Sequence, residues 1–219
     1  MRLGKIFVFV AMLAAVLPQA RADEKDEVLR QLDAAAKDFK SVTVNVEFDT
    51  IETVPIKDTD VMTGVAYYER DGKRFKMAAH LTTHNGAQTA KTYIFSEGKF
   101  RISETGKEKD AQTIDKVNKY ESYLMLGFGA SGSELKEKWE IKYLGKEKIG
   151  AVVADKLELI AKDPDVRKNI PKVTIWMDSS RAVSLKQVFD EGNGASKVCD
   201  YSNIKVNQKL PNNAFSFNK

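Results

Sequence analysis

Residues 41–48 have the sequence Ser41-Val-Thr-Val-Asn-Val-Glu-Phe48, in which every second side chain is apolar. Successive side chains of a β-strand point to opposite faces, so this alternation predicts a strand with one dry face and one wet face. Immediately before it, residues 23–39 carry apolar side chains three and four positions apart, which predicts an amphipathic helix. Acidic side chains at the start of this segment suit the positive end of a helix dipole. The folded domain is therefore expected to begin with a helix and a half-buried strand.

Nine further strand-like stretches follow, separated by turn sequences such as Asp71-Gly72, Asn85-Gly86 and Glu97-Gly98. They span residues 61–68, 74–79, 92–95, 99–103, 139–146, 151–161, 172–178, 184–190 and 197–206. Short links require antiparallel neighbours, because parallel strands need long crossover connections. Residues 118–138 interrupt the series and predict a short helix, a glycine-rich loop and a second helical turn.

A sheet of about ten strands rarely stays open and flat, so we expect an α+β fold with a strongly curled antiparallel sheet. Only three short helical pieces are available to cover its apolar face. The curled sheet then encloses either an apolar hollow, the usual form of a lipid-binding site, or a filled core, and the pattern favours neither. The residues expected on this concave face are Val44, Val46, Phe48, Phe75, Met77, Phe95, Leu157, Leu159, Trp176 and Val188.

The first 22 residues have the features of a secretory signal peptide. Arg2 and Lys5 precede a 12-residue apolar run, and Ala20-Arg-Ala22 provides the small-x-small cleavage pattern. A spanning helix needs about 20 apolar residues, so a membrane anchor is not favoured. We therefore expect export to the periplasm and cleavage after Ala22, which leaves residues 23–219 as one domain.

The net charge of +4 does not indicate a nucleic-acid partner. Three basic residues belong to the predicted signal peptide, so the mature chain carries only +1. Cys199 is the single cysteine, and one cysteine cannot form a disulfide within the chain. Stability is therefore expected from a hydrophobic core, for which the mature length is sufficient.

Motifs that carry catalysis or metal binding are incomplete in this sequence. Residues 127–132 match the glycine spacing of a dinucleotide fingerprint, but the surrounding pattern is antiparallel rather than βαβ. Ser133 and Lys136 have the Ser-x-x-Lys spacing of penicillin-binding enzymes without their other two elements, and Ser133 fits a helix N-cap better. His80 and His84 lie on a predicted strand, where four residues span roughly 13 Å. The sequence favours a binding protein over an enzyme, with no metal site and no cofactor.

Seven motifs occur in order along the chain, most densely from residue 123 onward. They are Tyr123-Leu-Met-Leu-Gly-Phe-Gly-Ala-Ser-Gly132, Lys156-Leu-Glu-Leu-Ile160, Val166-Arg-Lys168, Pro171-Lys-Val-Thr-Ile-Trp-Met-Asp178, Gln187-Val-Phe189, Tyr201-Ser-Asn-Ile-Lys-Val-Asn207 and Leu210-Pro-Asn-Asn-Ala-Phe215. Together they resemble the outer-membrane lipoprotein-sorting family, the relatives of the periplasmic carrier LolA.

The resemblance implies an unclosed antiparallel β-barrel with helices lidding an apolar cavity, which agrees with the curled sheet. It implies carriage of an acylated lipoprotein or a lipid toward the outer membrane, between a transient membrane-associated donor and acceptor. The sequence does not determine the oligomeric state, although a monomer is favoured. Relatives on the same fold also bind lipids or sense envelope stress, and a fold does not fix the cargo. The alternative is therefore a non-transporting envelope sensor or scaffold that binds a lipoprotein or an envelope protein.

The resemblance also implies a lid and a residue that holds it. In the family an arginine near the end of the second strand holds the lid and is needed for passing cargo on. Val65-Ala-Tyr-Tyr-Glu-Arg70 resembles that stretch and makes Arg70 the counterpart, but Asp71 stands where the family has proline, which leaves Arg74 as a rival. The lid is expected at Leu124, Leu126 and Phe128, with Gly127, Gly129 and Gly132 permitting movement.

Overall fold

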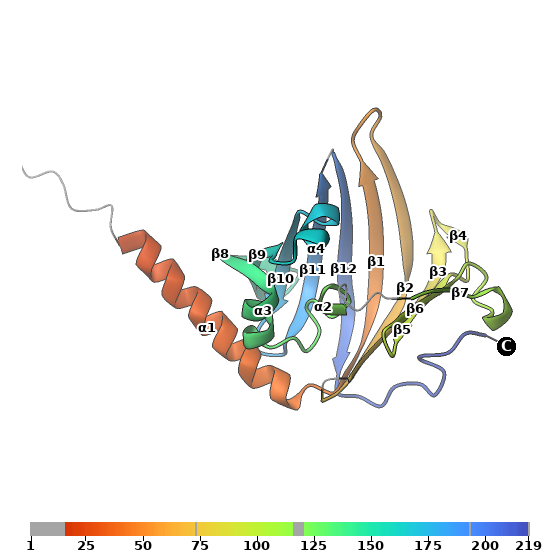
Figure 1. Ribbon diagram of the computed structural model, residues 1–219, viewed down its shortest axis with the longest axis horizontal. Coiled ribbons are helices and arrows are strands. Elements are labelled where there is room, and N and C mark those ends of the chain that lie inside the picture. Colours follow the sequence, from red (N-terminus) through yellow and green to blue (C-terminus); the bar gives the residue numbers. More distant parts are fainter. Residues whose placement is uncertain (1–15, 73, 116–120, 193, 219) are drawn as a thin grey trace, which may run out of the picture.

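The computed structural model describes residues 16–72, 74–115, 121–192 and 194–218 (Figure 1). Its strands are β1 (Ser41–Glu52), β2 (Asp58–Asp71), β3 (Arg74–His84), β4 (Ala87–Gln88), β5 (Thr92–Ser96), β6 (Lys99–Ser103), β7 (Gln112–Ile114), β8 (Trp139–Ile149), β9 (Val152–Ala161), β10 (Lys172–Asp178), β11 (Val183–Gly192) and β12 (Ala195–Val206). Its helices are α1 (Val16–Asp38), the 3-10 turn η1 (Glu108–Asp110), α2 (Glu121–Leu124), α3 (Gly132–Lys138) and α4 (Pro164–Asn169).

The twelve strands form one antiparallel sheet, in the order β7-β6-β5-β3-β2-β1-β12-β11-β10-β9-β8, with β4 paired to β3. The end strands β7 and β8 do not pair with each other, so the described part of the sheet is curled but not closed. The predicted α+β fold with an unclosed antiparallel sheet is therefore confirmed. The first strand, β1, pairs with the last, β12, in the middle of the sheet, with Phe48 opposite Cys199.

Helix α1 lies along the β8 end of the sheet, beside α3 (Figure 1). It begins at Val16 rather than at Asp23, so the acidic residues from Asp23 onward lie inside the helix instead of at its start. Most of the predicted signal peptide, residues 1–15, lies outside the described residues, and α1 continues through the predicted cleavage point at Ala22. Within the described part of the chain, no helix is long and apolar enough to cross a membrane.

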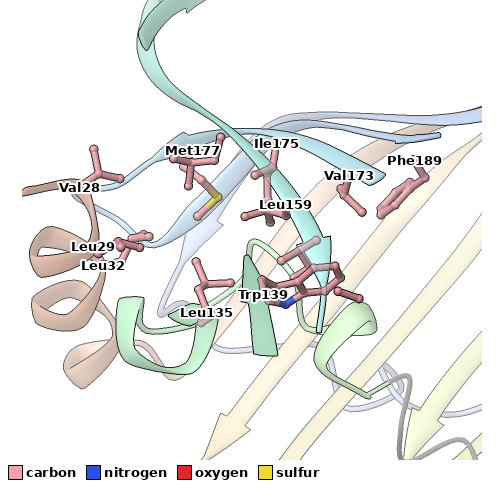
Figure 2. Packing of buried hydrophobic residues seen from close by; sticks show 14 of the residues in the cluster. Val28, Leu29, Leu32, Leu135, Trp139, Leu159, Val173, Ile175, Met177 and Phe189 are labelled. Carbon is pink, nitrogen blue, oxygen red and sulfur yellow. The ribbon is translucent and has the colours of Figure 1, made fainter. Parts of the chain in front are cut away.

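Two apolar clusters cover the concave face of the sheet. The first, called here the filled core, joins α1 and α3 to strands β8–β11, and Figure 2 shows its side chains packed together. Leu29 and Leu32 of α1 and Leu135 of α3 meet Leu159 and Ile175 of the sheet. The helical stripe predicted from the spacing in residues 23–39 is the face that makes this contact. The filled core therefore closes one half of the curled sheet.

The second cluster, called here the open core, lines strands β1, β2, β3 and β5. It contains Val44, Phe75 and Phe95 from these strands, together with Phe39 after α1 and Phe128 from the segment between α2 and α3. In this half, α1 and α3 contribute no buried side chain to the cluster. The cover over the open core is instead the short chain segment that carries Phe128.

The C-terminal segment after β12 packs against the outer face of strands β3 and β5. Phe217 forms a small cluster with Ala78 and Ile94, and the Ala214 carbonyl oxygen lies 2.8 Å from His80 Nε2. His84 pairs with Asp60, and no group of residues suited to a metal ion occurs among those described. Both histidines thus have structural partners.

Candidate ligand cavity

A cavity of about 410 Å³ lies on the concave face, between the open core and the inner side of β11 and β12. Its wall is mostly apolar and aromatic, with α2 and the end of α4 at its margin. The lining residues are Val46, Phe48, Ala66, Tyr68, Met77, Ala79, Leu81, Tyr93, Phe100, Tyr123, Leu124, Ile170, Gln187, Phe189, Glu191, Lys197, Cys199 and Tyr201. The size suits a single small ligand, because such sites usually measure about 300–1,000 Å³.

The structure brings four of the sequence-predicted residues into the cavity wall: Val46, Phe48, Met77 and Leu124. Other predicted residues lie on the same concave face but are packed into the two cores. Val44, Phe75, Phe95 and Phe128 belong to the open core, whereas Leu157, Leu159 and Leu126 belong to the filled core. Leu157 and Leu159 lie away from the hollow because the side chains of α1 and α3 cover that half of the sheet.

Trp176 and Val188 were expected on the concave face, and the structure places them elsewhere. Both join a small separate cluster with Ala154 and Leu185. On β10 the side chains that enter the filled core are those of residues 173, 175 and 177, so Trp176 between them points to the other face. Phe189 lines the cavity, which places its neighbour Val188 on the outer side of β11 by the same alternation.

Sequence reasoning missed the polar and aromatic part of the wall. Gln187 and Cys199 face each other across β11 and β12, and Cys199 faces Phe48 across β12 and β1. All three therefore share the inner face in one row. The register with Phe48, whose position was predicted, could have located the other two if the pairing of β1 with β12 had been foreseen.

Polar groups at the inner end of the cavity are already engaged. Gln187 Nε2 donates to the Leu126 carbonyl oxygen at 2.6 Å, and the Tyr201 hydroxyl donates to Gln187 Oε1 at 3.3 Å. Burial raises the pKa of the Cys199 thiol to about 12, and burial also raises the pKa of Tyr201 well above its usual value. These groups stay neutral at physiological pH, so the inner end of the cavity carries no ionised side chain.

The segment between α2 and α3, residues 125–131, is called here the cover segment. Phe128 is fully buried, stacks on Tyr68 with ring centroids 4.1 Å apart, and meets Tyr201 edge-on at 4.9 Å. Its backbone is tied to the sheet near β11, because Ser184 N donates to the Gly127 carbonyl oxygen at 2.6 Å and Gly129 N donates to the Ala182 carbonyl oxygen at 2.9 Å. The cover segment thus closes the boundary between the two cores.

Glycines in and beside the cover segment allow close approach in this state. A Cβ at Gly127 would lie 2.6 Å from Ser184 Cβ, and one at Gly129 would lie 2.3 Å from the Phe39 ring. Both glycines also have positive φ, which disfavours other residues. A Cβ at Gly132 would lie 2.1 Å from the Leu29 carbonyl oxygen of α1. The predicted movement of these glycines stays a prediction.

Arg70, at the end of β2, holds the cover segment by charged hydrogen bonds. Its Nη1 donates to the Gly129 carbonyl oxygen at 2.6 Å and to Glu134 Oε2 at 3.0 Å, and its Nη2 pairs with Glu134 Oε1. Glu134 in turn accepts from Ser131 N at 2.9 Å and completes a capping box at the start of α3. Ser131 is therefore the N-cap of α3, and the expectation of Ser133 in that role was wrong.

Arg70 and Arg74 have different surroundings. The Arg70 side chain is 14% exposed, whereas the Arg74 side chain is 83% exposed and pairs only locally with Asp71. Burial opposes ionisation of Glu134, but the hydrogen bonds from Arg70 and Ser131 outweigh it and lower the pKa of this carboxyl. Of the two arginines, Arg70 has the contacts expected of a residue that holds a lid.

No family model matches the sequence, and no curated protein matches it. Solved structures with similar folds include MucB in its complex with MucA from Pseudomonas aeruginosa, with 12% identity, a TM-score of 0.53, and coverage of 89% of this chain and 61% of that one. A conserved protein from Thermus thermophilus has 8% identity, a TM-score of 0.52, and coverage of 88% and 92%. A LolA superfamily protein from Nitrosomonas europaea has 16% identity, a TM-score of 0.41, and coverage of 88% and 97%.

All three likenesses lie far below 25% identity and concern the fold alone. This chain spans only about three fifths of the MucB chain, as the coverage of 61% shows. The outer-membrane lipoprotein-sorting family named from the motifs is represented among these structural neighbours.

Proposed function

We propose that this protein is a periplasmic carrier that binds the acyl chain of a lipoprotein or lipid in the cavity and releases it toward the outer membrane. The observation that carries the proposal is the mostly apolar hollow of about 410 Å³, which Tyr123 and Leu124 of α2 help to line. Each acyl methylene that leaves water contributes about 0.8 kcal/mol, so an apolar wall alone provides useful affinity. The role is one of binding rather than of catalysis.

The contacts of Arg70 support a cycle of opening and closing. In the closed state Arg70 joins β2 to the Gly129 carbonyl oxygen and to the capping carboxylate of α3. Entry of an acyl chain beside Phe128 separates these groups, and their re-formation favours the empty closed state when cargo leaves. The energy of the Arg70 contacts thereby assists release rather than uptake.

Native mass spectrometry of protein purified from its own periplasm tests the proposal. We expect a co-purifying lipid or acylated protein, and bare protein after delipidation. Hydrogen exchange with and without a myristoyl ligand tests the cover segment. We expect the protection of amides in residues 125–135 to change on binding, and unchanged protection there would argue against this segment as the gate.

A second function, as a non-transporting sensor or scaffold, is favoured by a different observation. The Pseudomonas aeruginosa structure pairs MucB, which shares this fold, with the protein MucA. On this alternative the protein binds an envelope protein through the same surface and carries nothing between membranes. Recovery of a stoichiometric protein partner without lipid in the same mass-spectrometry experiment would support the alternative over the carrier.

A further inference from the structure

One ion pair stands at the rim of the apolar cavity. Lys197 Nζ of β12 pairs with a carboxylate oxygen of Glu191 on β11, and both side chains line the cavity. They are the only charged residues among the described residues that form its wall. The Lys197 side chain is 38% exposed and that of Glu191 is 28% exposed, so both reach solvent and the hollow.

The pair lies at the end of an otherwise uncharged inner row on each strand. On β11 the row runs from Gln187 through Phe189 to Glu191, and on β12 it runs from Tyr201 through Cys199 to Lys197. The polar groups at the inner end, Gln187 and Tyr201, are bonded to each other and to the cover segment. A ligand charge can therefore be paired only at the outer end of these rows.

We infer that the cavity takes an amphiphile with one acyl chain and a zwitterionic phosphate–ammonium head group, whose two charges engage Lys197 and Glu191. This inference rests on the proposed acyl-chain binding. A volume of about 410 Å³ lies toward the lower end of small-ligand cavities, which favours one chain over several. With the chain inside the hollow, its head group is positioned at the rim where the ion pair stands.

Charge complementarity selects the head group. An anionic head that approaches Lys197 also meets Glu191, and a cationic head that approaches Glu191 also meets Lys197. A zwitterionic head exchanges the existing contact for two new ones, with its phosphate at Lys197 and its ammonium at Glu191. No half-buried charge is then left without a partner, which is the costly outcome for the other head groups.

Displacement of a fluorescent fatty-acid probe by monomeric myristoyl ligands tests the inference. The ligands are myristyl alcohol, lysomyristoyl-phosphatidylethanolamine and lysomyristoyl-phosphatidylglycerol, which share the chain and differ at the head. For the unaltered protein we expect the ethanolamine lipid to bind about tenfold more tightly than the glycerol lipid. Glu191→Gln should reverse that preference by removing the repulsion of the anion, and Lys197→Gln should weaken both phospholipids while sparing the alcohol.

A matched control is the neighbouring ion pair of Lys172 with Asp190, whose Nζ–Oδ2 distance is 3.2 Å. Asp190 precedes Glu191 in the chain, and neither Lys172 nor Asp190 lines the cavity. Asp190→Asn should therefore leave all three affinities unchanged. Equal affinities for the two phospholipids that also persist in the Glu191 and Lys197 variants would overturn the inference. Failure of the alcohol to displace the probe would instead overturn acyl-chain binding itself.

Discussion

The two halves of the sheet have the same antiparallel architecture, yet one is solid and the other is hollow. Over β8–β10, the side chains of α1 and α3 fill the concave face down to Leu159 and Ile175, which are essentially inaccessible. Over β1–β3, Phe39, α2 and the cover segment approach the sheet, and a cavity remains beside them. The halves thus differ in their cover, because among the described residues the long helix α1 packs on the solid half and not on the hollow one.

The largest expected difference between the halves is in the response to truncation. Leu159→Ala should lower the free energy of unfolding by about 2–5 kcal/mol, because it leaves a new void in a packed site. Met77 borders a void that already exists. Met77→Ala should therefore lower the free energy of unfolding by only about 1–2 kcal/mol, which is the transfer contribution of the lost atoms. Urea unfolding of the two variants measures both values. Equal losses would mean that the hollow collapses in solution.

A smaller effect is expected at the junction between the halves. Arg70→Leu removes charged hydrogen bonds to Gly129 and Glu134, a loss of about 1.5–3 kcal/mol from the closed state. Uptake of a myristoyl ligand should persist, whereas its transfer to acceptor vesicles should slow, and Arg70→Lys should rescue only partly because lysine lacks the planar fork.

Arg74→Leu is the control for this measurement, since Arg74 is exposed and pairs with the neighbouring Asp71 rather than with the cover segment. It should transfer ligand like the unaltered protein. If Arg74→Leu has the defect and Arg70→Leu does not, the contacts of Arg70 are structural and do not assist release.

The smallest effect is the pH dependence of the same junction. The pKa of Glu134 is lowered in the folded state, so its contribution to stability is present above the pKa of the unfolded chain and is lost as the pH falls through the folded value. Because Glu134 is partly exposed, the contribution should be below about 1 kcal/mol. Unfolding of the unaltered protein and of Glu134→Gln should differ at neutral pH and converge in acid. If the difference in free energy of unfolding stays the same at all pH values, it does not arise from the ionisation of Glu134.

Strand periodicity predicted the curled antiparallel sheet well, because residues such as Val42, Val44 and Val46 alternate cleanly with polar neighbours. The expectation that the sheet is unclosed came from the family resemblance. The sheet faces predicted for Trp176 and Val188 were wrong, because apolar residues stand next to each other there and do not alternate with polar ones. Ile175, Trp176 and Met177 are consecutive apolar residues, and the register of β10 with β11 shifts between the last two. A run of this kind does not reveal which of its side chains point inward.

The candidate site was predictable only in part. The alternation along the strand places Leu157 and Leu159 on the inner face. Whether a residue there borders a hollow depends on where α1 packs, and that is set by contacts between residues far apart in the sequence. Gln187 and Cys199 were missed because inner positions were predicted from large apolar side chains. Gln187 is polar and Cys199 is small, so neither fits that pattern. Arg70 came from the family resemblance, whereas its partner Glu134 was not predicted.

The pairing of β1 with β12 has a consequence for how the chain acquires its structure. β1 and β12 meet at the centre of the sheet, so the solid and hollow halves remain separate until β12 is available. Contacts this distant in sequence make folding slow. Until then β1 and β11 each expose an unpaired edge that other chains can join, so the newly made protein is most prone to aggregate before β12 docks.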